Sequence, residues 1–160
     1  MAEPPTHNAL DSNIKATSIA LLNARLADTI DLALAVKQAH WTLKGAAFIA
    51  VHEMLDKLRD DMDEYADTMA ERAATLGGTP LGTASVVAKA TALEPYPLNL
   101  RKIPDHVHAL MERTAALGNA VRDNIDAAAD AGDANTADVF TEVSRGLDKW
   151  LWLLESHLPA

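Results

Sequence analysis

Four long segments of the chain repeat apolar residues at the spacing of an amphipathic helix. They cover residues 12–42, 45–78, 105–131 and 136 onwards. Residues three and four positions apart lie on one face of a helix, so each segment predicts a helix that buries one side. The pattern is clearest in the second segment, which has no internal Pro or Gly before it ends at Gly77-Gly78, a usual helix stop.

A long connection separates the second predicted helix from the third, which Asp105 is expected to cap. Within the connection, residues 84–92 have the pattern of a short helix. Four prolines interrupt the rest of it: Pro80, Pro95, Pro97 and Pro104. A connection of this length predicts one crossover between distant helix ends. The fold class is therefore all-α: a ferritin-like four-helix bundle with a short extra helix in the long connection between helices 2 and 3.

The composition agrees with a helical bundle. The 160 residues are 49% hydrophobic and only 4% aromatic, and none is Cys, which excludes disulfides and thiolate chemistry. Residues 1–11 are expected to form a flexible N-terminal tail and residues 12–160 a single domain. The chain has neither the start of a signal peptide nor an apolar run long enough to span a membrane, so a cytoplasmic protein is expected.

One polar face of the second predicted helix carries an unusual line of titratable side chains. The line consists of His52, Asp56, Asp60, Asp63, Asp67 and Glu71, at intervals of four, four, three, four and four. This spacing places them on a single stripe, where like charges repel unless a cation neutralises them. A solvated acidic face is the alternative explanation of the carboxylates, but the imidazole in phase with them favours metal binding.

Two ligand pairs lie at opposite ends of this stripe. Eleven residues separate Asp56 from Asp67, which at the helical rise is roughly 16 Å, too far for one ion. An antiparallel two-fold contact between two copies would bring His52 to Glu71 and Asp56 to Asp67, and would build two identical sites. His40, on the apolar face of the first predicted helix, is able to join His52 and Asp56; its alternative role is packing in the core or an interface.

The ligand pattern resembles that of the Dps mini-ferritins, members of the ferritin-like superfamily. The stretch KQAHWTLKGAAFIAVHEMLD, followed by DTMAERAATLGG, has the pattern His-x11-His-x3-Asp-x10-Asp-x3-Glu. No Glu is followed three residues later by His, so the di-iron site inside a ferritin-type bundle is absent. The resemblance covers nearly the whole chain, including SRGLDKWLWLLES.

The resemblance implies a Dps-type ferroxidase that stores iron in a hollow homo-dodecamer. Each two-fold interface would hold two ferroxidase sites, each with His40, His52 and Asp56 from one subunit and Asp67 and Glu71 from its partner. The implied reaction is oxidation of Fe(II), preferably by hydrogen peroxide, with ferric mineral kept in the cavity as protection against oxidative damage. Imidazoles and carboxylates are suitable ligands for ferrous iron.

Two tryptophans are candidates for donating electrons to a trapped oxidant. Trp41 adjoins His40, and Trp152 matches a tryptophan that the family has near its C-terminal end. Packing is the alternative role for both. Trp150 is assigned to the core.

An iron-uptake pore is the third functional feature that the resemblance implies. In the family, carboxylates near the start of the fourth helix line a three-fold pore, and here Asp133, Asp138 and Glu142 lie in that region. The alternative is a solvated helix start, where acids favour the dipole. His106 and His108, at the start of the third helix, are interpreted as surface residues without an assigned role.

DNA binding, with compaction of the nucleoid, is the alternative function. Family members that bind DNA often carry a mobile tail rich in Lys or Arg, because neutralised phosphates supply most of the affinity. Here the first twelve residues contain neither, and the net charge is −9. We therefore expect the protein not to bind duplex DNA or anionic membranes.

Overall fold

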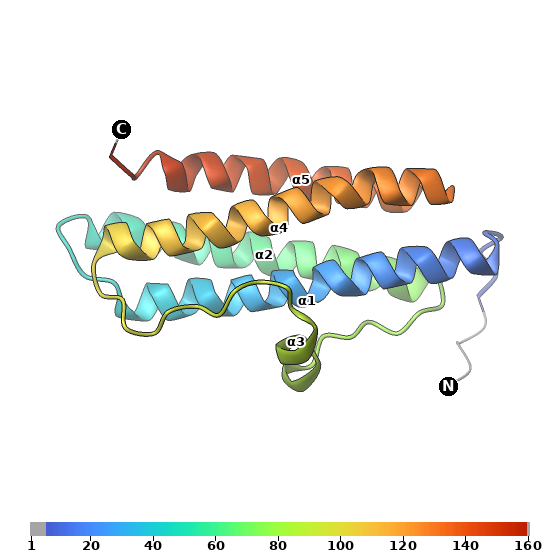
Figure 1. The fold of residues 1–160 in the computed structure, drawn as a ribbon, viewed down its shortest axis with the longest axis horizontal. Coiled ribbons are helices and arrows are strands. Elements are labelled where there is room, and N and C mark those ends of the chain that lie inside the picture. The colour runs from blue at the N-terminus through green and yellow to red at the C-terminus, as the bar shows by residue number, and fades with distance from the viewer. Residues whose placement is uncertain (1–5, 160) are drawn as a thin grey trace.

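The computed structural model of the chain describes residues 6–159 as a bundle of helices (Figure 1). The helices are α1 (Ser12–Thr42), α2 (Phe48–Thr75), α3 (Ala84–Ala90), α4 (Ile103–Ala131) and α5 (Ala134–Glu155). The four long helices lie side by side, and α3 is a short helix in the connection between α2 and α4. The predicted all-α four-helix bundle with a short extra helix in that connection is confirmed.

Helices that are neighbours in sequence form two antiparallel pairs. Residues 43–47 link α1 to α2, and residues 132–133 link α4 to α5. Links this short bring consecutive helices together as antiparallel neighbours, and these two pairs share the most extensive contacts in the bundle. Residues 76–102 form the predicted crossover, which returns the chain along α1 to the start of α4 (Figure 1).

The core is built from the apolar stripes of all four long helices. Its largest fully buried side chains include Leu22, Leu32, Leu55, Met62, Leu110, Leu117, Phe140 and Leu147. Each such side chain contributes about 1.5–3 kcal/mol by leaving water, so the stripes decide which helix faces meet. Trp150 belongs to this core, as predicted: it is 5% exposed, and its indole N–H donates to Asp61 Oδ2 at 2.6 Å.

The starts of α4 and α5 differ from the prediction. α4 begins at Ile103 rather than after an Asp105 cap. Pro104 is tolerated in its first turn, because backbone N–H groups there have no intrahelical acceptor and the N–H that proline lacks is not needed. Asp105 lies in that first turn, where its charge is favourable to the helix dipole. α5 begins before the predicted Thr136, because the Asp133 carboxylate accepts a hydrogen bond from the Thr136 N–H at 3.0 Å and caps the helix.

The second predicted helix ends close to its expected stop. The segment 45–78 contains α2 as Phe48–Thr75. Gly77 follows with a φ of 88°, a left-handed conformation that costs glycine little. The Gly78 N–H then donates to the Ala73 carbonyl at 2.9 Å and closes the helix end.

Part of the expected N-terminal tail lies against the bundle. Residues 1–5 lie outside the described residues. Of those that follow, Asn8 accepts a hydrogen bond on its backbone carbonyl from Lys15 Nζ at 2.5 Å, and Leu10 packs against the core. The first basic side chain of the chain is therefore engaged within the subunit.

Each long helix has a polar face as well as a buried one. In the part of the chain that the structure describes, no helix is long and apolar enough to cross a lipid bilayer.

Candidate metal centre

The link between α1 and α2 brings three of the five predicted ligands together. His40 lies in the last turn of α1 and His52 near the start of α2, and the antiparallel packing places these helix ends side by side. His40, His52 and Asp56 each offer a ligand atom within 4.8 Å of the others, and they are the one such group of three or more among residues 6–159. His40 is 7% exposed, so the group lies partly beneath the surface.

Reciprocal hydrogen bonds fix both imidazole rings. His40 Nδ1 lies 3.0 Å from the His52 carbonyl oxygen, and His52 Nδ1 lies 3.0 Å from the His40 carbonyl oxygen. A carbonyl oxygen only accepts, so each Nδ1 carries a hydrogen and each neutral ring keeps a lone pair on Nε2. The rings stack with centroids 3.5 Å apart. This arrangement orients two imidazoles as a metal site requires.

Asp56 is held ionised beside the histidines. Its Oδ1 accepts a hydrogen bond from Lys37 Nζ at 2.8 Å and lies 3.3 Å from His40 Nδ1. The Lys37 hydrogen bond is the main cause that lowers the pKa of Asp56 below its ordinary value. Lys37 was not among the predicted site residues, although its position three residues before His40 places it on the same helix face. A cation that binds Asp56 must displace this ammonium group or share the carboxylate with it.

Asp67 and Glu71 do not join this group within one chain. Both are exposed on α2, and the unbroken helix keeps them far from Asp56. Asp67 lines an open groove of about 390 Å³ between α2, α1 and the segment after α2, together with Asp63, Ile30 and Leu26. The second pair of candidate ligands therefore faces outward, as a site shared between two subunits would require.

Comparisons with known proteins agree with this fold and ligand pattern. The family model for a ferritin-like domain matches residues 19–159. A relative from Agrobacterium fabrum, named DNA protection during starvation protein, is 53% identical over 153 residues, which cover 96% of this chain and 94% of the relative. The chain belongs to the Dps family.

Solved structures of the family superpose on nearly the whole chain. DpsC from Streptomyces coelicolor has a TM-score of 0.94 and 31% identity, and the match covers 99% of this chain and 93% of the DpsC chain. Dps from Microbacterium arborescens, solved in a high iron form, has a TM-score of 0.87 and 31% identity, and the match covers 96% of this chain and 98% of that structure's chain. The predicted ferritin-like fold and Dps resemblance are confirmed.

The two candidate redox tryptophans of this Dps-family chain are both exposed. Trp41 is 69% exposed and Trp152 62% exposed, so neither packs in the core of its own subunit. The Lys37 ammonium lies 6.0 Å from the centroid of the Trp41 ring, which places this indole at the edge of the metal centre. A role in electron donation stays a prediction for both.

Asp133 does not line a pore, which corrects the sequence interpretation. It is 1% exposed and accepts hydrogen bonds from Ser18 Oγ at 2.8 Å, from Thr136, and from Arg72 Nη2 at 2.8 Å. Burial raises the pKa of this carboxyl, but the bonds from Thr136, Ser18 and Arg72 outweigh burial, so its pKa lies below the ordinary value. Asp138 and Glu142 are exposed on α5, and their role in iron uptake stays a prediction.

The interpretation of His106 as a surface residue is also wrong. His106 is 1% exposed, and its ring bonds to Tyr96 and Thr42. The crossover covers this part of α4, which the periodicity of α4 alone does not show. His108 is exposed as expected, with Nε2 3.4 Å from Glu112.

Proposed function

We propose that this chain is a ferroxidase and iron-storage protein that oxidises Fe(II), preferably with hydrogen peroxide, and keeps the ferric product inside a hollow homo-dodecamer. The observation that carries this proposal is the division of the ligand set. His40 of α1 converges with His52 and Asp56 of α2 within one chain. Asp67 and Glu71, further along α2, face outward.

A two-fold contact between α2 helices would complete the centre. Antiparallel pairing sets Asp67 of one subunit opposite Asp56 of the next, and Glu71 opposite His52. The same operation generates two sites, so each two-fold interface would offer two ferroxidase centres. The oriented Nε2 atoms and the ionised Asp56 supply the nitrogen and oxygen ligands that Fe(II) accepts.

Iron as the substrate is supported by a relative of the same fold. The Microbacterium arborescens Dps is described in a high iron form. In the proposed reaction, two Fe(II) ions each give one electron to one hydrogen peroxide molecule, which takes up two protons and becomes two water molecules. Reduction by two electrons at one paired centre avoids release of a hydroxyl radical, and this is the proposed protection.

Anaerobic titration of the assembled protein with Fe(II), followed by peroxide, tests this proposal. We expect bound iron to saturate at a fixed ratio per subunit, and each peroxide to oxidise about two Fe(II), because two one-electron donors balance one two-electron oxidant. His52→Ala protein serves as the control for iron bound elsewhere. Saturation at the same ratio in this variant would contradict the proposed site.

Asp138 and Glu142 are proposed to guide iron inward. The double substitution Asp138→Asn with Glu142→Gln should slow iron uptake severalfold and weaken its dependence on salt, because an acidic entrance concentrates cations. Peroxide oxidation of iron already bound at the centre should be unchanged. Stopped-flow absorbance at two salt concentrations measures both rates, with Asp130→Asn as an exposed control. Equal uptake in the double variant and the wild type would place the route elsewhere.

We propose that protection does not require contact with DNA. The net charge is −9 per subunit, and Lys15, the first basic residue, is bonded to Asn8. A gel-shift assay at neutral pH, with chelator present, should show no retarded duplex at physiological salt. Adding a short Lys-rich tail should create binding that falls steeply with salt, since each neutralised phosphate adds to the slope. A retarded band with the unmodified protein would favour nucleoid compaction instead.

A further inference from the structure

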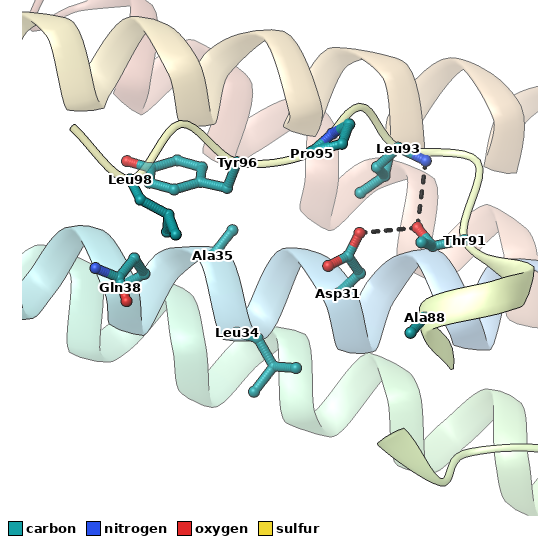
Figure 2. A pocket seen from close by; sticks show the side chains of 10 residues that line it. All are labelled: Asp31, Leu34, Ala35, Gln38, Ala88, Thr91, Leu93, Pro95, Tyr96 and Leu98. Atoms are coloured by element: carbon teal, nitrogen blue, oxygen red, sulfur yellow. Dashed lines mark hydrogen bonds between the residues drawn. The ribbon is translucent and has the colours of Figure 1, made fainter. Parts of the chain in front are cut away.

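The second half of the crossover, residues 91–102, runs as an extended segment over α1; we call it the crossover strap. Figure 2 shows Pro95, Tyr96 and Leu98 of the strap facing α1. An open groove of about 420 Å³ lies between the strap and α1, which lines it with Ala35 and Gln38. The strap therefore forms one wall of a groove whose other wall is the helix that carries His40.

Contacts at its first half fix the strap to α1 and α4. At its start, the Ala92 N–H donates to Asp28 Oδ1 at 2.7 Å, and Thr91 Oγ1 donates to Asp31 Oδ2 at 2.9 Å. Further along, Arg113 of α4 donates to strap carbonyls, including that of Glu94 at 3.1 Å. These bonds are formed by charged groups and do not depend on an imidazole.

The end of the strap is joined to the link between α1 and α2. The Lys44 N–H donates to the Arg101 carbonyl at 2.7 Å, and the Ile103 N–H donates to the Lys44 carbonyl at 3.2 Å. Between this end and the first half of the strap lies His106, buried under Tyr96.

The hydrogen bonds around His106 fit the tautomer that carries its proton on Nε2. Thr42 Oγ1 donates to the Gln38 carbonyl at 2.7 Å, so this hydroxyl accepts from His106 Nε2, 3.4 Å away. The Nε2–H tautomer leaves a lone pair on Nδ1, and Nδ1 accepts from the Tyr96 hydroxyl at 2.6 Å. Neutral His106 thus connects the strap to the last turn of α1 with every polar atom of the ring used.

We propose that His106 is a proton-operated latch: the neutral ring fastens Tyr96 and the end of the strap, and a second proton on the ring releases them. An imidazolium has two N–H donors and no acceptor, so it cannot receive the Tyr96 hydroxyl hydrogen. Protonation would force the bond between Nδ1 and Tyr96 to reverse, so that the Tyr96 O–H loses its acceptor inside the protein and a charge is buried beside it.

The groups around His106 oppose the charged form. Burial is the main cause that lowers the pKa of His106 below its ordinary 6.5, and Arg101 of the strap adds to it. The Leu100 carbonyl and Asp105 of α4 act in the opposite direction without cancelling the shift.

Burial keeps Tyr96 in its protonated form, because it raises the pKa of this hydroxyl. Arg113 of α4, 5.1 Å from the centroid of the Tyr96 ring, lowers that pKa without cancelling the effect of burial. The contacts from α1, Thr42 and Gln38, do not titrate. The latch therefore contributes its full stability above about pH 6.5 and loses that contribution as pH falls through the lowered pKa of His106.

Amide hydrogen exchange of the assembled protein tests the latch. It is measured at about pH 7.5 and about pH 5, on either side of the ordinary pKa of an imidazole, and corrected for intrinsic exchange rates. In the wild type, the amides of Lys44 and Ile103 should exchange about tenfold or more faster at the lower pH, relative to α2 amides. His106→Gln offers an amide oxygen to Tyr96 and an amide N–H to Thr42, and it does not titrate. It should keep these amides protected at both pH values.

His108→Gln, an exposed change two residues away, is the matched control and should behave as the wild type. Tyr96→Phe removes the donor, so its exchange at these amides should be fast already at the higher pH. Wild-type exchange that is equal at both pH values would overturn the latch, as would unchanged acid acceleration in His106→Gln. If His106→Gln does not assemble, Tyr96→Phe decides, since retention of the wild-type acid response in that variant also overturns the proposal.

Discussion

Replacing His52 by Ala should lower the rate of fast Fe(II) oxidation by about a hundredfold or more, since loss of even an outer partner of a metal ligand costs about 10–100-fold. Asp67→Ala should have an equal effect, although Asp67 lies far from His52 within one chain. Equal losses from two distant positions are expected only if both belong to one centre. Stopped-flow absorbance of ferric product, on assemblies whose size is verified, measures the rates.

Asp60→Ala is the matched control for the acidic stripe. Asp60 lies on the same face of α2, between the two ligand pairs, and is exposed like Asp67. Since it is not part of the ligand pattern, its removal should leave the rate within about twofold of wild type. If Asp60→Ala and Asp67→Ala slow oxidation equally, the stripe acts as a diffuse acidic surface and not as a ligand set.

Asp133→Asn should destabilise the fold more than any other single change of a polar residue considered above. The substitution breaks a buried ion pair with Arg72, whose side chain is 13% exposed, and weakens the cap of α5. Breaking a buried pair typically costs about 3–5 kcal/mol. For a chain of this length, that loss should lower Tm by about 10 °C in thermal unfolding at fixed protein concentration.

The pH dependence of this effect distinguishes the ion pair from simple packing. The pKa of Asp133 in the fold lies below its ordinary 3.8, so the pair stabilises the protein fully above that pH and loses its contribution as pH falls further. The difference in Tm between Asp133→Asn and wild type should therefore shrink below about pH 3.8. The exposed Asp130→Asn is the control and should change Tm little at any pH. A difference that stays constant with pH would contradict the role of the charge.

Helical periodicity predicted the long elements well because it reports burial directly. The segment 12–42 matches α1, since its apolar stripe continues without interruption between its ends. The start of α4 was placed late because Asp105 is a good capping residue, whereas the structure uses Pro104 in the first turn. Local preferences permit α4 to begin either at Ile103 or after Asp105. In the folded chain, the Ile103 N–H donates to the Lys44 carbonyl, a contact that accompanies the start at Ile103.

The convergence of three candidate ligands could be predicted from spacing, but their surroundings could not. The i, i+4 pair on α2 and the short link to α1 are both visible in the sequence, and they bring His40 to His52 and Asp56. Lys37 was missed because a basic residue is not expected among cation ligands. Its ammonium bonds Asp56 only because α1 and α2 pack with these faces together.

Asp133 and His106 were misplaced for a common reason. Each belongs to a polar network formed by residues distant in sequence: Asp133 with Ser18 and Arg72, and His106 with Thr42. Charge and local position make both residues resemble surface groups. Only tertiary contacts show that the chain covers them, so a single sequence gave no signal for either network.

Mixed assemblies of His52→Ala and Asp67→Ala subunits test the shared centre most directly. In a two-fold pair of unlike subunits, one site carries both defects and the other carries none, because the two sites draw opposite halves from each chain. Random pairing at equal amounts should therefore restore about a quarter of the wild-type fast oxidation, although each variant alone is inactive. Assemblies of verified equal composition that stay as inactive as the separate variants would contradict the claim that two subunits form each site.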